Sequence, residues 1–472
     1  MKTHLQNLFL LPALTAGFGL AFAGHLSAQT FTILYSFSAT SGSGVNSDGH
    51  GPFGGLLLSG NTLYGTARYG GTLGAGTVYA INTDGTGFRT LHSFDGGSGG
   101  ALPNAALALS SDTLYGTTCD CGGNGGANGT VFSVKTNGTS FRILHRFSAN
   151  PYGTNKDGAY PTSALAISGN TVYGTAQEGG PFTNAGGYGN GTVFSLNLDG
   201  TGFKTIYAFT AVTNGALPYA GPIVSGDTLY GTANGGPFGG GTVFAVKTNG
   251  TGYTNLHSFS RSDCGPAAGL LLSGGMLYGT TSCTVFGVRT DGTGFRTLHT
   301  FTAISAGTDL TDTLILSGNT LYGTARQGGT GNFPTYNGAG TVFAVNTDGT
   351  GFTTLYMFSG GSDGALPSGS LALSENTLYG AALAGGDWGS GTIFSLSLPP
   401  PPPQLTISAD GTGGYLIELY GTANVTYELQ RAPSLTGPWD TFDTQTAPAS
   451  GLIEFHDWFA SPDRAFYRAL QQ

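Results

Sequence analysis

The chain repeats one pattern of four short strands seven times between residues 31 and 398, and this repetition limits what it can fold into. The tetrad LYGT or a close variant marks repeats 1 to 7, with its tyrosine at Tyr64, Tyr115, Tyr173, Tyr230, Tyr278, Tyr322 and Tyr379. Each tetrad follows a run such as LLLSG and precedes a run such as TVFAV and an aromatic run such as GFRTLHSF. Runs of β-branched, aromatic and aliphatic residues broken by Gly or Asn are typical of strands. The sequence therefore predicts an all-β repeat architecture.

The ends of the repeated region indicate that the repeats close into a ring. Residues 31–37, FTILYSF, match the fourth strand of a repeat but have no earlier strands before them. The last repeat, residues 371–398, has three strands and runs into five prolines where its fourth strand should be. An open solenoid is the alternative, but it has no use for complementary ends. We therefore predict a seven-bladed β-propeller whose N-terminal strand closes the last blade.

The connections between strands divide into constant and variable ones. The first and second strands start 7 residues apart in all seven repeats, and the third and fourth start 10 apart in all six complete ones. The connection from second to third strand varies from 7 to 20 residues, and that from fourth strand to the next repeat from 11 to 19. In an up-and-down blade these two kinds of connection lie on opposite faces. One face is thus expected to be a constant scaffold, and the other to vary.

The repeats, with LYGT, GTVFAVNTDGTGF and DGALP, resemble the GloVer-type tandem repeat of bacterial exported "choice-of-anchor" proteins over residues 31–398. The resemblance implies export and a surface location. It implies no activity and no catalytic residues.

The segments outside the repeats indicate export and a second domain. Residues 1–28 have a positive start, an apolar run and small residues before Ala28, as a secretory signal peptide does. Residues 399–403 are a polyproline linker, and residues 404–472 contain about six strand-like runs, which predict a small β-sandwich of immunoglobulin or fibronectin type. No later segment approaches the roughly 20 apolar residues of a membrane span. We therefore expect a monomeric extracellular or outer-surface protein without an integral membrane span.

Cysteine usage supports an oxidising compartment. Cysteine in an exported chain is usually paired. Cys264 and Cys283 both lie near one end of the hairpin formed by the first two strands of repeat 5, which has the shortest connection from second to third strand. We predict a disulfide between them. Cys119 and Cys121 are too close in sequence for an easy bridge, so a strained bond and free thiols both remain open.

No catalytic residues, metal ligands or cofactor are predicted. Four histidines share one repeat position with tyrosines of other repeats, which indicates packing: His92, His145, His257 and His299. Most acidic residues of the repeats, such as Asp48, Asp157, Asp263 and Asp363, occupy repeated turn positions and are interpreted as local turn formers. Six fall outside the pattern and would have to supply the two carboxylates of a glycosidase or lyase: Asp95, Asp120, Glu178, Asp309, Glu375 and Asp387. A secreted carbohydrate-active enzyme is therefore the alternative function.

The favoured function is binding by the variable face. Seven aromatic residues stand in the connections from second to third strand, outside the strand pattern: Tyr69, Phe182, Tyr188, Phe238, Phe333, Tyr336 and Trp388. Only 9% of the residues are charged and the net charge is −9, which disfavours nucleic acid. Aromatic rings on a face with little charge suit a neutral polysaccharide or a surface protein. Trp388, Tyr336 and Tyr188 are the strongest candidate contacts.

Overall fold

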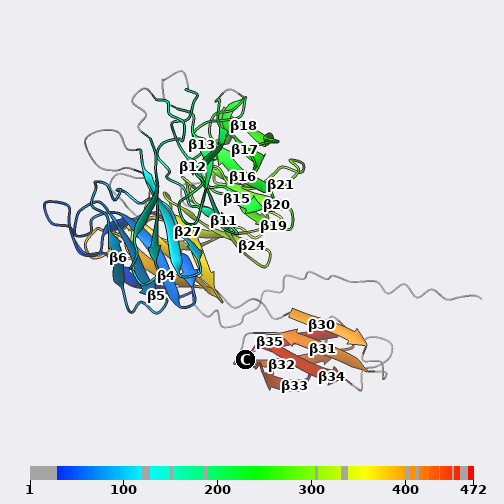
Figure 1. The fold of residues 1–472 in the computed structure, drawn as a ribbon. Coiled ribbons are helices and arrows are strands. Elements are labelled where there is room, and N and C mark those ends of the chain that lie inside the picture. The colour runs from blue at the N-terminus through cyan, green and yellow to red at the C-terminus, as the bar shows by residue number, and fades with distance from the viewer. Residues whose placement is uncertain are drawn as a thin grey trace, which may run out of the picture. The chain divides into compact units, whose positions relative to one another are not determined.

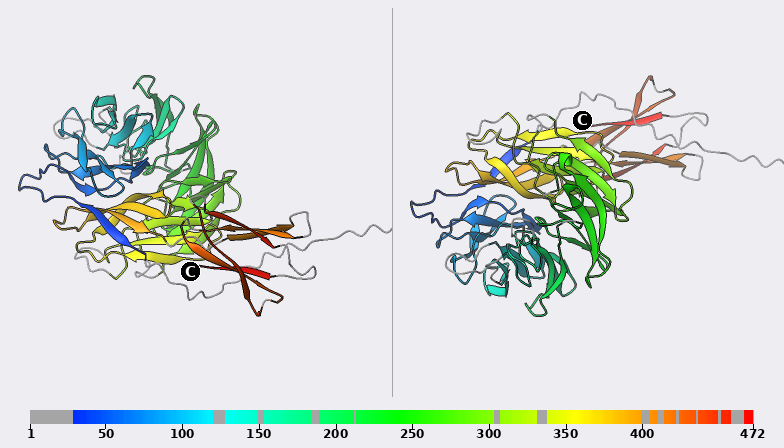
Figure 2. Two further views of the ribbon diagram at one scale, coloured as in Figure 1. Left: turned by 90° about the horizontal axis from the view of Figure 1, so that it is seen from below. Right: turned by 90° about the horizontal axis from the view of Figure 1, so that it is seen from above.

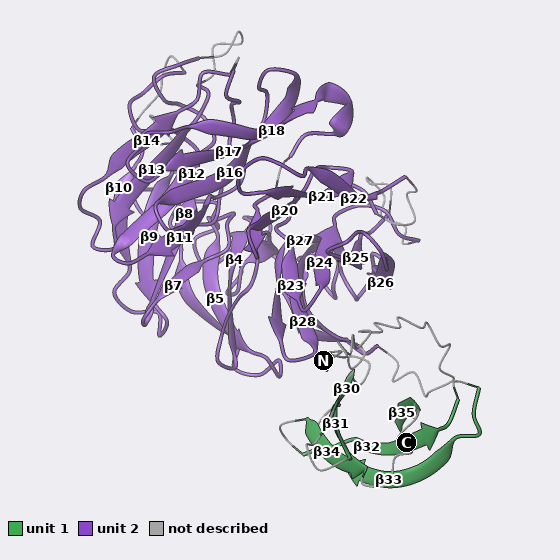
Figure 3. Ribbon diagram, turned by 90° about the vertical axis from the view of Figure 1, so that its right-hand side faces the viewer, with its two compact units in different colours: residues 1–28, 399–472 green, residues 29–398 purple. Residues whose placement is uncertain are grey.

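A computed structural model describes residues 29–398 and 404–471, apart from residues 120–127, 149–152, 184–188, 212, 267, 303–306, 331–337, 410–413, 422–423, 435, 449–450 and 458–465. These residues fall into two compact units, with residues 29–398 in one and the residues from 404 onward in the other (Figures 1 and 3). The predicted signal peptide and linker lie outside the described residues. In the described part of the chain, no helix is both long and apolar enough to cross a bilayer.

Residues 29–398 form seven antiparallel sheets, one for each sequence repeat. The first strands are β3 (Leu57–Ser59), β7 (Ala108–Ser110), β11 (Ala166–Ser168), β15 (Ile223–Ser225), β19 (Leu271–Ser273), β23 (Ile315–Ser317) and β27 (Ala365–Ser374). The second strands are β4 (Thr62–Tyr69), β8 (Thr113–Thr118), β12 (Thr171–Ala176), β16 (Thr228–Ala233), β20 (Met276–Thr280), β24 (Thr320–Ala325) and β28 (Thr377–Ala384). The strand pattern of the sequence is thus confirmed in every repeat.

The outer half of each sheet is equally regular. The third strands are β5 (Thr77–Asn82), β9 (Thr130–Lys135), β13 (Thr192–Asn197), β17 (Gly239–Lys247), β21 (Thr284–Arg289), β25 (Thr341–Asn346) and β29 (Thr392–Ser397). The fourth strands of repeats 1 to 6 are β6 (Arg89–Ser93), β10 (Arg142–Arg146), β14 (Lys204–Ala208), β18 (Thr254–Ser260), β22 (Arg296–Thr300) and β26 (Thr353–Met357). A short strand β2 (His50–Pro52) adds to the first sheet, and a 3₁₀ turn η1 (Arg261–Asp263) follows β18.

The N-terminal strand β1 (Phe31–Ser36) completes the last sheet, in the order β1-β29-β28-β27. In Figure 2 the blue start of the chain lies beside the yellow strands of repeat 7. Strand β1 carries the same register shift against β29 that the other fourth strands carry against their third strands. It is therefore a repeat strand displaced to the start of the chain. The seven sheets form a β-propeller-like all-β fold.

Aromatic stacking joins each sheet to the next. The His or Tyr two residues before the closing Phe of a fourth strand lies parallel to an aromatic ring of the following repeat, with ring centroids 3.5–4.2 Å apart. The seven pairs are Tyr35–Phe88, His92–Phe141, His145–Phe203, Tyr207–Tyr253, His257–Phe295, His299–Phe352 and Tyr356–Phe31. Both rings of β1 belong to this series, so β1 contacts repeats 6 and 1. A planar ring stacks whether it is His or Tyr, which explains why the two interchange.

In three repeats an aspartate also forms a hydrogen bond with this His or Tyr. Asp48 accepts hydrogen bonds from the Tyr35 hydroxyl at 2.9 Å and from the Ser38 backbone N–H at 2.8 Å. Asp157 contacts the His145 ring and the Ser148 N–H in the same way, and Asp363 contacts Tyr356 and Ser359. The interpretation of these aspartates as local turn formers was therefore incomplete. These three aspartates tie their connections to the fourth strands that precede them.

The predicted disulfide between Cys264 and Cys283 is confirmed, with their Cα atoms 5.9 Å apart. It joins the residue after η1 to the short connection between β20 and β21. Beside it, Pro266 and Thr281 form an isolated β-bridge, and the Ser282 N–H donates to the Gly265 carbonyl. The bond thus closes repeat 5 at the position where the other repeats have longer connections.

The C-terminal unit contains two three-stranded sheets. One has the order β30 (Gln404–Ala409), β31 (Tyr415–Tyr420), β34 (Leu452–Asp457), and the other β33 (Asp440–Thr446), β32 (Thr426–Ala432), β35 (Phe466–Gln471). Ile417, Leu419, Tyr427, Leu429 and Phe455 share one buried cluster. All-β structure is thus confirmed in this unit as well.

Candidate functional site

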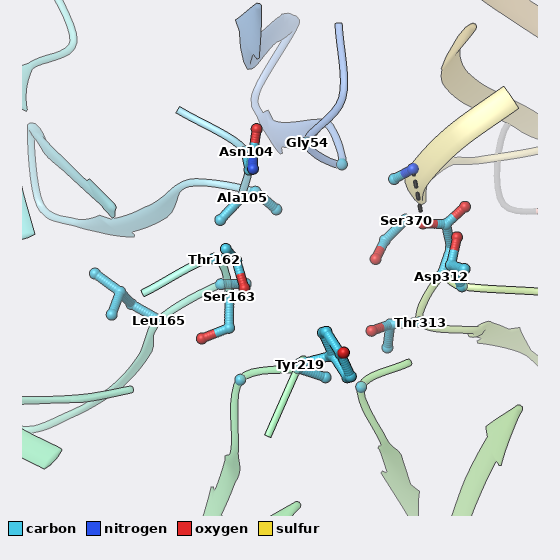
Figure 4. Close-up of a pocket in the computed structure, with 18 of the residues that line it drawn as sticks. Gly54, Asn104, Ala105, Thr162, Ser163, Leu165, Tyr219, Asp312, Thr313 and Ser370 are labelled. Carbon is cyan, nitrogen blue, oxygen red and sulfur yellow. Dashed lines mark hydrogen bonds between the residues drawn. The ribbon is translucent and has the colours of Figure 1, made fainter. Parts of the chain in front are cut away.

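A cavity of about 1050 Å³ lies where all seven repeats meet. Its wall is built mainly from residues just before or within the first strands, together with residues at or just after the ends of four of the second strands. Both segments lead into variable connections, so the cavity belongs to the variable face. Figure 4 shows Tyr219 and Asn104 on opposite sides of it. We call this cavity the channel site.

Left-handed backbone shapes its rim. The residue before the segment that leads into each first strand, Pro-x-x-x-Leu in five repeats, has a positive φ in every repeat, and five of these seven residues are not glycine: Leu102, Tyr160, Leu217, Asp309 and Leu366. Such a conformation costs a non-glycine residue about 1–2 kcal/mol. In each of these five, the backbone N–H donates to a carbonyl of the preceding repeat, as Tyr160 does to Asn128 at 2.7 Å. Contact between repeats therefore stabilises the strained rim.

Three aromatic rings line the channel site: Phe53, Tyr160 and Tyr219. The tyrosines are partly exposed. Neutral hydrogen-bonding side chains also line the channel site, among them Asn104, Thr162 and Gln177. This combination of flat apolar surfaces with neutral donors and acceptors can stack on and hydrogen-bond to a polyhydroxylated ligand.

Four charged side chains also reach the wall: Arg68, Glu178, Asp312 and Arg326. The guanidinium carbons of Arg68 and Arg326 lie 5.5 and 5.7 Å from the centroid of the Phe53 ring. Burial raises the pKa of Glu178 above its usual value. Of the two carboxylates, only Glu178 is one of the six that the sequence places outside the repeated turn positions.

Asp312 replaces a contact that repeats 1 to 4 make through the backbone. In repeats 1 to 4 the threonine of LYGT donates to a carbonyl of the next repeat, as Thr66 does to Ala105 at 3.1 Å. In repeat 6, Thr324 donates instead to the Asp312 carboxylate at 2.8 Å, and the Gly369 N–H of repeat 7 donates to its other oxygen at 2.8 Å. The carboxylate is thus placed between two repeats. Burial raises its pKa from 3.8 to about 6, although these two hydrogen bonds and Arg326 act against the rise.

Replacement of Asp312 by Asn is expected to stabilise the protein above pH 7. Because the pKa of Asp312 is higher in the folded than in the unfolded chain, its stabilising contribution is complete below pH 3.8 and is lost as the pH rises through 6. The neutral amide should therefore raise the free energy of unfolding at pH 8 by on the order of 2 kcal/mol and give no gain at pH 4. Urea unfolding at both values measures this. Asp84→Asn is the control with the opposite sign, since its hydrogen bonds with Thr86 lower the pKa of Asp84. Destabilisation by Asp312→Asn at pH 8 would contradict the assignment.

Four of the aromatic residues expected from the sequence are described, and they lie outside the channel site. Phe238 and Trp388 are 65% and 64% exposed, and Phe182 and Tyr69 are also exposed. Tyr69 stacks on His50, with ring centroids 5.2 Å apart, and the Arg68 guanidinium carbon lies 5.2 Å from its ring. Tyr188, Phe333 and Tyr336 fall outside the described residues, as do Asp120 and Cys121. Cys119 is buried and lines the cavity.

Sequence reasoning missed the channel residues, although the repeat register contains a signal for them. At the position of Asp312, the other repeats have Gly54, Ala105, Ser163, Ala220, Ala268 and Gly369. The aspartate is an exception at a position where the six other repeats have Gly, Ala or Ser. Arg68 and Arg326 are exceptions at another register position, where the other five repeats have no charged residue.

Comparison with known proteins identifies the repeat. No curated protein matches the chain. Among solved structures, the chain is similar to an oligogalacturonate lyase from Vibrio parahaemolyticus, at 11% identity over 79% of this chain and 97% of the other, with a TM-score of 0.46. It is also similar to the extracellular domain of a protein described as a one component system from B. thetaiotaomicron, at 13% identity over 93% and 48% of the two chains, with a TM-score of 0.49. A third is described as a 6-phosphogluconolactonase from Bacteroides uniformis, at 16% identity over 85% and 99%, with a TM-score of 0.44.

The family assignment does not depend on these distant similarities. The model of the Gloeobacter/Verrucomicrobia repeat matches residues 13–187 and 282–427, which together make up most of the chain. The matched segments contain LYGT and GTVFAVNTDGTGF, the sequences that first indicated this resemblance. The chain therefore belongs to the Gloeobacter/Verrucomicrobia repeat family.

Proposed function

We propose that the protein is exported and binds a glycan at the channel site, at the bacterial surface or outside the cell. The observation that carries this proposal is the cavity of about 1050 Å³, which is lined by Phe53, Tyr160 and Tyr219 together with neutral polar side chains. Cavities of this size with apolar walls and a few directed polar groups are typical of small-ligand sites. The signal-like residues 1–28 and the Cys264–Cys283 disulfide support export.

The proposed function is accompanied by a proposed architecture for the two units. We infer that the seven sheets are the blades of a seven-bladed β-propeller and that residues 404–472 form a sandwich of immunoglobulin or fibronectin type after a polyproline linker. A rigid ring holds loops whose length can change without disturbing the core, so binding specificity belongs in those loops. The exposed rings of Tyr69, Phe182, Phe238 and Trp388 then extend the binding face beyond the channel, together with the sequence candidates Tyr188, Phe333 and Tyr336.

The test is binding of the purified protein to a glycan array, followed by calorimetry on the glycans that bind. We expect Tyr219→Ala to weaken binding at least tenfold, since stacking on a desolvated ring supplies about 1 kcal/mol or more beyond buried area. Trp388→Ala should weaken it less, because Trp388 lies outside the cavity. Tyr420→Ala, which removes an exposed ring of the C-terminal unit, is the matched control and should have no effect. Unchanged binding by Tyr219→Ala would contradict the channel site.

Glu178 and Asp312 support a second candidate function, that of a secreted carbohydrate-active enzyme. Both carboxyl groups line the cavity, and burial raises the pKa of each, which is the property of a general acid. Hydrolysis or elimination of a bound glycan that is lost in both Glu178→Gln and Asp312→Asn would favour the enzyme. Binding without turnover of any bound glycan favours the binding protein.

A further inference from the structure

Arginine occupies one register position of the channel site in two repeats only. This position directly follows the second strand or is among its last residues, and it holds Arg68 in repeat 1 and Arg326 in repeat 6. The other repeats have Cys119, Gln177, Asn234, Ser282 and Leu383 there. The whole chain has only 16 Lys and Arg residues among 472. The fold does not require arginine at this position, since the other five repeats lack it. Two arginines in one cavity of a chain with so few basic residues therefore indicate a role in binding rather than in folding.

The two guanidinium groups meet at one ring. The Arg68 and Arg326 guanidinium carbons lie 5.5 and 5.7 Å from the centroid of Phe53. Arg68 also lies 5.2 Å from the Tyr69 ring. Cation–π contact fixes the position of a guanidinium and leaves its N–H groups free to donate elsewhere. The rings thus hold Arg68 in place without neutralising it.

Charge balance differs between the two arginines. Arg326 has the Asp312 carboxylate near enough for its charge to influence that group. Within the described ranges, the Arg68 Nε is buried without a hydrogen-bond acceptor, and none of the ion pairs found there includes Arg68. A half-buried guanidinium with no anion is unfavourable, because its desolvation is not offset. An anionic group on a ligand would supply the missing partner.

The surroundings select the kind of anion. A carboxylate matches the planar fork of arginine and accepts two parallel hydrogen bonds from it. Glu178 and Asp312 line the same cavity and would repel a second negative charge, so a monoanion fits better than a phosphate dianion. We propose that Arg68 binds the carboxylate of an acidic sugar, with Phe53 and Arg326 completing this part of the channel site. This proposal rests on the proposed function, glycan binding at the channel site. The proposal replaces the neutral ligand suggested by the sequence with a uronic acid.

The experiment uses galacturonate and glucuronate trisaccharides and their methyl esters, which keep the ring and linkage and remove the charge. Calorimetry on the full chain should give at least tenfold tighter binding of one acid than of its ester. Arg68→Gln should abolish this preference, and Arg68→Lys should lose most of it, because an ammonium cannot donate in the bidentate arrangement. Arg89→Gln makes the same change of charge at an exposed site in strand β6 and should retain the preference.

Four results bear on the proposal. An increase in salt from 50 to 500 mM should weaken binding of the acid and leave binding of the ester unchanged. Arg68→Gln should melt at the same temperature as the parent protein or higher, because it removes a half-buried charge that has no ion-pair partner among the described residues. Equal binding of acid and ester, or a preference that survives Arg68→Gln, would overturn the proposal and leave the glycan site standing. Binding of neither the acid nor the ester, nor of any glycan on the array, would overturn both.

Discussion

Deletion of residues 31–37 is expected to abolish cooperative folding of the repeat unit and to cause aggregation. The deletion removes β1, the fourth strand of the last sheet, and exposes the edge of β29. It also removes Phe37, which is fully buried, and Phe31, which stacks 3.8 Å from Tyr356 and 5.2 Å from Phe394. Loss of the buried Phe37 costs about 3–5 kcal/mol, and loss of the half-buried Phe31 and of the strand pairing adds to it, so the total approaches the stability of a typical domain.

Size-exclusion chromatography and thermal unfolding measure the effect, and two smaller variants separate its causes. Phe37→Ala should lower the melting temperature clearly and leave the protein monomeric, because the strand still covers the edge. A synthetic peptide of residues 29–38 added during refolding of the deletion variant should restore solubility. A deletion variant that is monomeric and melts at the parent temperature would show that β1 does not close the ring.

The double variant Cys264→Ser, Cys283→Ser is expected to lose about 3 kcal/mol of stability, the cost estimated for a cross-link of this loop length. The two residues are 19 apart in the sequence, and their bond takes the place of a long connection in repeat 5. Urea unfolding of the parent and the variant gives the difference. Reductant should lower the free energy of unfolding of the parent toward that of the variant. The free energy of unfolding of the variant should be nearly the same with and without reductant. Alkylation of Cys264 without prior reduction would refute the pairing.

The repeat fold was predictable because its determinants are local and occur seven times. The constant spacings from Leu56 to Leu63 and from Val78 to Phe88 define tight hairpins, and the isolated strand at residues 31–37 has one partner left in the chain. The disulfide followed from two cysteines that flank one hairpin. Each inference compares a segment with its own copies and needs no knowledge of distant contacts.

Contacts between repeats were harder to predict. The stacking of His92 on Phe141 joins residues 49 positions apart and depends on how neighbouring sheets pack. Asp48 was interpreted as a turn former because its sequence context, NSDG, is typical of turns, and nothing in that context indicates its bond with Tyr35. The channel site depends on ring closure, which brings Phe53 and Arg326 together across 273 positions.

Hydrogen exchange of the full chain, with and without a glycan identified on the array, locates the bound ligand on the protein. A ligand that binds where the seven repeats meet on the variable face covers the wall of the channel site. We therefore expect slower exchange in the segments around Asn104, Ser163 and Ala220, which line the cavity, and no change in the constant turns at Asp84 and Asp199. Protection confined to those constant turns or to residues 404–471, with none around the cavity, would contradict binding at the channel site.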